Sequence, residues 1–355
     1  MKSNSLKFLK ALLDAPGPSG FEVAPARIWR AEAESFADTV RGDVSGNSVA
    51  AINPDADRRV MFAGHIDEIG LMIVHVDDDG FLHFGTIGGW DSQVLVGQRI
   101  LIATRGGLIP GVIGKKPIHL IKSDERDKAS KVTDLWIDIG ATGKKDALKR
   151  VRVGDPAVLA GPAEELPNGR IVSRSIDNRI GAFVVLEALR LLKRPKPKTG
   201  VFAVATAQEE IAWGGGGART SATDINPTVA LVVDVTHATD CPGIEKKEVG
   251  DFKLGGGPVL SRGSAVNPVV FDMLVETAER EKIPYSIQAA PTDTGTDADA
   301  IYTAQRGIAT GLVSVPNRYM HTPNEMVTLD DLERTARLLA AFARRVTATT
   351  DFTPR

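Results

Sequence analysis

The sequence predicts an α/β protein in which one α/β domain is interrupted by a small β-rich insert. Continuous apolar strands at 201–207 and 229–235 are typical of parallel strands that are covered on both faces. From about 70 to 165 the chain instead shows short β-rich runs separated by Gly, Asp and Pro, without a long helical period. The length of 355 residues agrees with two domains, because single cores stop growing at roughly 250–300 residues. We therefore expect one domain from residues 1–69 with 166–355, and a sandwich or barrel from residues 70–165.

The first 69 residues predict a helix followed by a strand. Leu6, Leu9 and Leu13 recur at helical spacing, and the Pro-Gly-Pro that follows ends the pattern. Residues 57–69 form an apolar strand that runs into a polar loop near His65. Lysines interrupt the N-terminal apolar residues, as they would not in a signal peptide, and the chain lacks a run of about 20 apolar residues. We expect a cytoplasmic protein that does not associate with membranes.

Strands in the insert and helices after it complete the expected fold. The runs GFLHFG, RILIATR, GVIG, TDLWIDIG and PAVLAG predict strands of the insert. In SIDNRIGAFVVLEALRLLK, two adjacent apolar rows make a wide stripe, which predicts a helix packed on a sheet. A last helix is expected to begin near Thr328, an N-cap residue with Asp331 three positions later. Helices therefore alternate with strands through the second half of the chain.

Composition and missing motifs exclude several function classes. The chain has 43 Lys and Arg against 45 Asp and Glu, a net charge of −2, and so lacks the positive excess of a nucleic-acid binder. Its single cysteine, Cys241, excludes an internal disulfide and a paired-cysteine zinc site. The phosphate loop, the dinucleotide-binding glycine motif, the serine-hydrolase elbow and H-E-x-x-H are also absent. The common nucleotide-dependent and serine-dependent enzymes are thus disfavoured.

Several histidines and carboxylates directly follow predicted strands or end them. Others begin a helix or lie in a loop. The candidate site residues are His65, Asp67, Asp177, Glu209, Glu210, Asp234 and His321. Asp234 ends the apolar run VALVVD, where a partly buried carboxylate needs a partner. Each of the others has an ordinary structural explanation when taken singly; Asp177, for example, is a plausible N-cap. Ligands bind beyond the carboxyl ends of strands in open α/β sheets, so we expect these side chains to converge there.

The residue types select metal chemistry. Two imidazoles with several carboxylates suit zinc, cobalt or manganese rather than calcium or copper(I). Two ions in one site share a carboxylate that bridges them at about 3.5–4 Å, and a further carboxylate serves as general base. The adjacent pair Glu209-Glu210 can supply a ligand and a base. Asp67, two residues after His65, is placed to hold the other nitrogen of that imidazole.

Eight motifs together resemble one enzyme family in order along nearly the whole chain. They are PGPSGFE (16–22), GHIDEIG (64–70), GVIGKKPIHL (111–120), SIDNRIG (175–181), QEE (208–210), VVDVTHATDCPG (232–243), GTDADAI (295–301) and VPNRYMHTP (315–323). They resemble the dinuclear metallo-aminopeptidases of the tetrahedral, deblocking and glutamyl aminopeptidase family, some of which are named cellulase M or endoglucanase.

The resemblance implies a phosphorylase/hydrolase-like mixed-sheet catalytic domain and a β-barrel-like insert that mediates dimer contacts. It implies two divalent ions per subunit, zinc first, with cobalt or manganese as alternatives. It assigns His65 and Asp234 to one ion, Glu210 and His321 to the other, Asp177 to a bridge, Glu209 to the general base, and Asp67 to the orientation of His65. It also implies dimers that assemble into a tetrahedral dodecamer.

These roles predict an aminopeptidase that removes the N-terminal residue of short peptides with metal-activated water. Two alternatives remain, a metal-dependent N-acyl amino acid deacylase and an endoglucanase-type glycoside hydrolase that works with two carboxylates. The segment IAWGGGGAR (211–219) is longer and richer in glycine than its counterpart in the family. A loop beside the general base helps to shape a substrate pocket, so the preferred N-terminal residue does not transfer with the mechanism.

Overall fold

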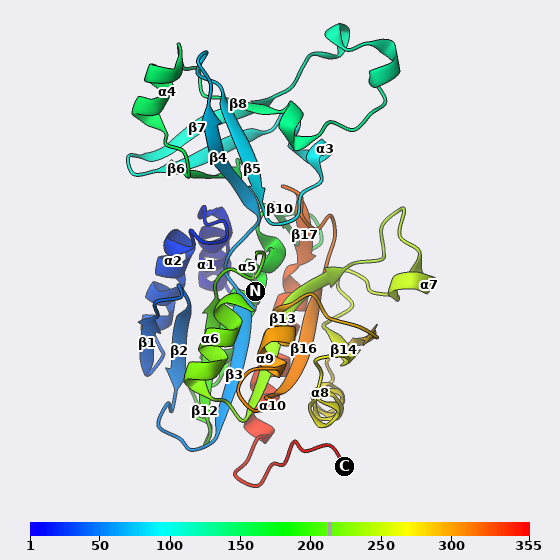
Figure 1. Ribbon diagram of the computed structural model, residues 1–355. Helices are drawn as coiled ribbons and strands as arrows, with labels where there is room; N and C mark the ends of the chain where they lie inside the picture. The colour runs from blue at the N-terminus through cyan, green and yellow to red at the C-terminus, as the bar shows by residue number, and fades with distance from the viewer. Residues whose placement is uncertain (212–214) are drawn as a thin grey trace.

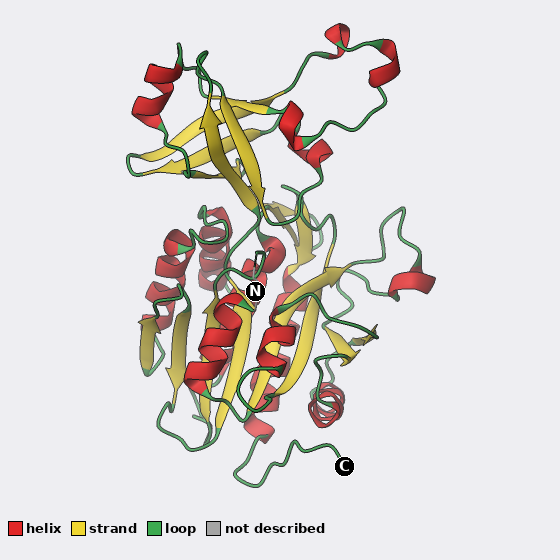
Figure 2. Cartoon of the chain, in the orientation of Figure 1, coloured by secondary structure: helices red, strands yellow, loops and turns green. Residues whose placement is uncertain are grey.

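A large mixed sheet and a closed barrel make up the architecture of the chain (Figure 1). The computed structural model describes residues 1–211 and 215–355, so part of the glycine-rich segment 211–219 lies outside the described residues. The barrel stands beyond one end of the sheet, and helices cover both faces of the sheet (Figure 2). The predicted α/β fold with a β-barrel-like insert is confirmed. The domain limits at 69/70 and 165/166 stay a prediction.

The main sheet has eight strands, and its centre is parallel. Their order is β1 (Thr39–Gly42), β2 (Ser48–Ile52), β12 (Gly200–Thr206), β3 (Arg59–His65), β13 (Val229–His237), β16 (Ala309–Asn317), β14 (Val259–Gly263) and β15 (Ser286–Ala290). Strand β3 runs parallel to both β12 and β13, and β13 runs parallel to β16. The apolar runs of the sequence are thus central strands, as predicted. One detail is wrong: β13 does not end at Asp234, because its pairing with β16 continues to His237.

Helices form a layer on each face of this sheet. One layer contains α1 (Ser3–Asp14), α2 (Val23–Glu34), α5 (Ile176–Leu191), α8 (Pro268–Arg280) and α10 (Leu329–Arg345). The other contains α6 (Gly216–Ile225) and α9 (Asp297–Tyr302), and the short α7 (Lys246–Val249) lies in a projecting loop. Thr328 caps α10 and accepts a hydrogen bond from the Asp331 amide, as predicted. Among the described residues, no helix is both long and apolar enough to cross a bilayer.

Close packing between β3 and α5 brings two candidate site residues together. A Cβ on Gly64 would lie 2.5 Å from the backbone carbon of Gly181 in α5, which is too close for any side chain. Glycine at position 64 therefore allows the first turns of α5 to approach the end of β3. His65 follows Gly64 at the end of β3, and Asp177 lies at the start of α5.

The insert is a closed barrel with a core of its own. Its strands, in order around the barrel, are β4 (Gly70–Val76), β5 (Leu82–Ile87), β8 (Trp136–Asp138), β7 (Gly107–Gly114), β6 (Arg99–Thr104) and β9 (Pro156–Leu159). Its short helical pieces are α3 (Ser92–Leu95), α4 (Lys144–Arg150) and the 3₁₀ turns η1 (Ile118–Leu120), η2 (Ser123–Glu125) and η3 (Val132–Asp134). Ile73, Leu82, Ile102 and Ile137 are fully buried in its core. A third sheet consists of β10 (Glu164–Leu166), β11 (Arg170–Ser173) and β17 (Glu325–Thr328). Its strands β10 and β11 come directly after the barrel in the sequence.

Candidate metal centre

The candidate side chains lie in one group at the carboxyl end of the central strands. His65 Nε2 lies 3.2 Å from Asp177 Oδ1. The same nitrogen lies 3.7 Å from Glu209 Oε2 and 4.0 Å from Asp234 Oδ1. His65 ends β3, Asp234 lies in the neighbouring β13, and Glu209 follows β12 on the other side. The predicted convergence of these residues is thus what the parallel centre of the sheet produces.

Asp177 lies between the two histidines and presents one oxygen to each. Its Oδ1 faces His65, while Oδ2 lies 3.4 Å from Nε2 of His321. That nitrogen of His321 also lies 3.4 Å from Glu210 Oε2. His65, Asp177 and Glu210 each offer a ligand atom within 4.8 Å of the others. A carboxylate with one oxygen toward each of two ligand groups has the arrangement of a bridging ligand.

The barrel contributes to the orientation of His321. The Nδ1 atom of the ring lies 2.8 Å from the backbone oxygen of Gly89, in the segment that leaves β5. A hydrogen bond at Nδ1 leaves Nε2, which faces Asp177 and Glu210, free to act as a ligand. The insert thus sets the ring orientation of one candidate ligand.

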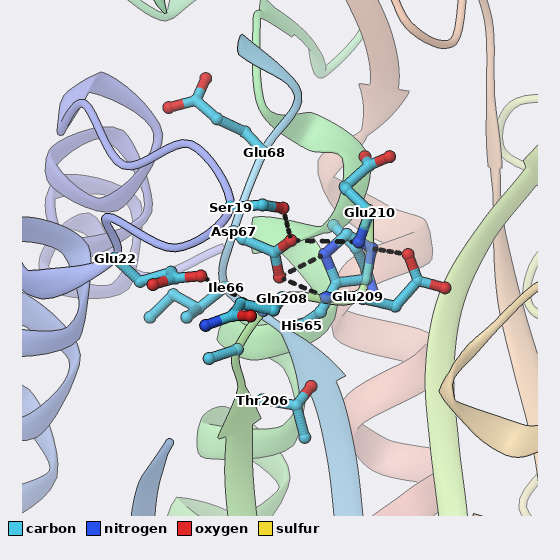
Figure 3. A network of polar contacts seen from close by, with 12 residues as sticks. Ser19, Glu22, His65, Ile66, Asp67, Glu68, Thr206, Gln208, Glu209 and Glu210 are labelled. Carbon is cyan, nitrogen blue, oxygen red and sulfur yellow. Dashed lines mark hydrogen bonds and ion pairs between the residues drawn. The ribbon is translucent and has the colours of Figure 1, made fainter. Parts of the chain in front are cut away.

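Asp67 is fully buried and joins the histidine to the glutamate pair. Its Oδ1 lies 3.4 Å from His65 Nδ1. The same carboxylate accepts hydrogen bonds from the amides of Glu209 at 3.2 Å and Glu210 at 3.1 Å, and from the hydroxyl of Ser19 (Figure 3). One carboxylate therefore lies beside an imidazole and fixes the backbone that carries two candidate catalytic side chains.

Two further side chains bind the backbone just before the glutamate pair. Asn47 Oδ1 accepts from the amide of Ala207 at 3.0 Å, and Glu22 Oε1 accepts from the amide of Gln208 at 3.2 Å. Gln208 has a φ of +61°, a conformation that costs free energy for a residue with a side chain. Together with Asp67, these groups accept hydrogen bonds from the amides of residues 207–210. Side chains from other segments of the chain therefore fix the conformation of this turn.

Burial, with crowding of acids second, dominates the electrostatics. Burial raises the pKa of Glu209 to about 10, and nearby Asp234 and Asp297 add to the rise. Burial also raises the pKa of Asp234 well above its usual range. Contacts with Asp177 and Glu210 raise the pKa of His321 to about 11. Burial opposes a charge on Asp177, yet the two imidazoles hold its pKa well below the usual value. Glu209, Asp234 and His321 thus bind protons strongly, whereas Asp177 stays ionised.

This donor set fits divalent metal ions. Imidazole nitrogens and carboxylate oxygens are ligands of zinc, cobalt and manganese. Oε1 of Glu210 is buried without a hydrogen-bond partner among the described residues, which is costly for a carboxylate unless a cation is bound. Two ions would offset the carboxylate charge that burial makes unfavourable.

Sequence reasoning missed several residues of this centre, namely Ser19, Glu22, Asn47, Asp297 and Glu325. Asp297 is buried at the start of α9 and accepts a hydrogen bond from Thr206, the last residue of β12. It lies within GTDADAI, a motif quoted without a role for any one residue, so the signal was present. Ser19 and Glu22 lie within PGPSGFE, which was likewise quoted without a role for any one residue, whereas Asn47 acts on a backbone amide and lies in none of the quoted motifs.

Comparison with known proteins places the chain in a family. Residues 46–338 match the model of the M42 glutamyl aminopeptidases. The chain is 33% identical to lysyl aminopeptidase of Pyrococcus furiosus over 98% of this chain and 99% of the relative. A TET aminopeptidase from a marine sediment archaeon of the Thaumarchaeota superposes with a TM-score of 0.92 at 36% identity, covering 97% of both chains. The TET1 peptidase of Pyrococcus horikoshii gives 0.85 at 33% identity, covering 96% of this chain and 100% of that one.

These matches confirm the family that the eight motifs indicated, and they span both the sheet domain and the barrel. The convergence of histidines and carboxylates at the end of the sheet agrees with a metallopeptidase. The chain therefore belongs to the M42 glutamyl aminopeptidase family and is an aminopeptidase.

Proposed function

We propose that the chain is a co-catalytic, two-metal aminopeptidase that removes the N-terminal residue of short peptides. The observation that carries this proposal is the position of Asp177, whose two oxygens each face one imidazole at 3.2 and 3.4 Å. A further carboxylate lies beside each imidazole, Asp234 near His65 and Glu210 near His321. This is the symmetry that a pair of ions with a shared ligand requires.

The proposed assignment gives one histidine and one further carboxylate to each ion. His65 and Asp234 would hold the first, Glu210 and His321 the second, and Asp177 would be shared. Zinc is the first choice, and cobalt or manganese suits the same donors. When bound, such ions supply Lewis acidity and make water a stronger acid at neutral pH.

Glu209 is the proposed general base. Its carboxylate lies 3.7 Å from His65 Nε2, next to the proposed ligands, and its amide is fixed by Asp67. Glu209 takes a proton from the attacking water and returns it to the leaving amine of the peptide.

We also propose that the barrel of residues 70–165 mediates dimer contacts and that dimers assemble into a tetrahedral dodecamer. Val74, Leu108 and Val112 are exposed apolar residues on strands of the barrel, which supports a contact surface there. The related P. horikoshii peptidase assembles into a tetrahedron or a larger octahedral shell. Native mass spectrometry should show twelve subunits; a stable monomer at micromolar concentration would contradict this proposal.

A substrate panel tests the proposed reaction. Chelator-stripped protein is assayed with aminoacyl-p-nitroanilides and their N-acetylated forms after the addition of zinc, cobalt or manganese. We expect turnover only after metal addition and only of substrates with a free amine. Preference for the acylated forms would instead identify a deacylase, and hydrolysis of cellulose by the stripped protein would identify a glycoside hydrolase. The same panel reads out the preferred N-terminal residue.

A further inference from the structure

Glu325 is a buried carboxylate that belongs to none of the motifs quoted above. It is the first residue of β17, it is 2% exposed, and it lies opposite Ser173 of β11 in the small third sheet. The strand pairing fixes its backbone, so its side chain projects from a defined point. Its side chain reaches the candidate metal centre at the first turn of α5.

The two oxygens of Glu325 each bind the backbone of a different proposed ligand. Oε2 accepts a hydrogen bond from the amide of Asp177 at 2.9 Å. Oε1 accepts one from the amide of His321 at 2.8 Å. Asp177 and Glu325 are 148 positions apart in the sequence, so this carboxylate links two distant segments. Asp177 and His321 are also the two residues whose side chains approach each other at 3.4 Å.

The backbone of His321 needs such support. His321 has a φ of +59°, in the left-handed region that residues other than glycine seldom adopt, and it lies in the loop between β16 and β17. The hydrogen bond from the His321 amide to Oε1 of Glu325 favours one loop conformation. The bond from Glu325 therefore stabilises the backbone from which the imidazole projects.

We propose that Glu325 is a positioning residue that sets the relative placement of Asp177 and His321 and thereby the affinity for the second metal ion. This rests on the proposed two-metal function. Residues that orient ligands typically change metal affinity by about 10–100-fold when they are substituted. Because Asp177 would be shared by both ions whereas His321 would belong to the second alone, loss of Glu325 should weaken the second ion more than the ion at His65 and Asp234.

The test is a cobalt titration of chelator-stripped full-length protein, read by visible absorption. The wild type should bind two Co²⁺ ions per subunit. In Glu325→Gln the amide group can accept from one backbone N–H but presents an N–H donor to the other. We expect one ion to bind about 10–100-fold more weakly, with an altered absorption band, and the other ion to be weakened less. Glu164→Gln is the matched control, because Glu164 is an exposed carboxylate in the same small sheet.

The outcomes separate this proposal from the proposed function. Fewer than two Co²⁺ ions on the wild type would contradict the two-metal function itself. Two ions on the wild type, with Glu325→Gln binding both as tightly, would overturn the role of Glu325. Equal weakening of both ions would overturn it too, since His321, which Glu325 supports, would belong to the second ion alone. Should Glu325→Gln fail to fold by circular dichroism, Glu325→Asp keeps the charge, shortens the reach and is read by the same criteria.

Discussion

The two halves of the proposed metal centre are held in different ways. The strand half consists of His65 and Asp234, which lie in β3 and β13 and are 1% and 4% exposed. The loop half consists of Glu210, in the turn after β12, and His321, in the loop between β16 and β17. The His321 side chain is 34% exposed. The residues of the strand half therefore lie on buried strands of the sheet, whereas those of the loop half lie on segments that connect strands.

The backbone groups of the two halves have different hydrogen-bond partners. Strand residues are fixed by the ladder of the parallel sheet, with little dependence on any one side chain. The loop half depends on buried carboxylates, because Asp67 accepts from the amide of Glu210 and Glu325 from the amide of His321. We conclude that substitutions remote from the ligands should affect the loop half far more than the strand half.

The largest effect is expected at Glu209, which separates chemistry from ligand binding. Glu209→Gln keeps the shape of the side chain but cannot accept a proton, so kcat should fall by about 10²–10⁴-fold. Metal content and melting temperature should remain those of the wild type. The measurement is kcat on an aminoacyl-p-nitroanilide together with metal analysis of the same sample. Normal turnover by this variant would remove Glu209 from the mechanism.

Asp67 contacts residues of both halves, so its substitution should weaken the binding of both ions. In Asp67→Asn, a side-chain amide replaces the carboxylate that accepts hydrogen bonds from the backbone amides of Glu209 and Glu210. The same carboxylate faces His65. We expect about 10–100-fold weaker binding of both ions. Isothermal titration of the stripped variant with Zn²⁺ measures this. Weakening of one ion alone would show that Asp67 serves only the half to which that ion belongs.

Sequence patterns predicted the strand half better than the supports of the loop half. One apolar run leads into His65 and another leads into Asp234. A polar residue directly after such a run is expected to be buried, and this can be recognised locally in the sequence. Glu325 lies in a short polar stretch, and its burial depends on β17 pairing with β11, whose residues are about 150 positions away. Asn47 and Glu22 act through backbone amides brought close by the fold. Such long-range pairings leave no periodicity, and this is also why the shorter edge strands were not predicted.

Metal binding should strengthen with pH in both halves, because burial also raises the pKa of Asp234 well above its usual range. Contacts with Asp177 and Glu210 raise the pKa of His321 to about 11, so the metal-free side chain is protonated at pH 7. A metal ligand must be deprotonated, and binding therefore releases this proton and strengthens as the pH rises toward that pKa. The affinity for the second ion should increase by about tenfold per pH unit between pH 6 and 8. Competition with a metal indicator at three pH values measures the slope, and a flat profile would contradict the prediction.

The smallest effect is expected at Glu22, which supports the turn without contacting a ligand. Glu22→Gln weakens the hydrogen bond from the amide of Gln208, worth about 1 kcal/mol, so kcat should fall about two- to tenfold. Both metal affinities should be unchanged. Steady-state kinetics with a parallel cobalt titration checks this. A loss as large as that of Glu209→Gln would mean that Glu22 takes part in proton transfer.

The central claim is that two ions, one for each half, are needed for activity. Metal ions per subunit can be counted by native mass spectrometry and elemental analysis, alongside kcat, in the wild type and in His321→Ala. We predict two ions in the active wild type and one in His321→Ala, with activity lost in the variant because the ion of the loop half is missing. Full activity with one ion or none, or two ions retained in His321→Ala, would contradict the account.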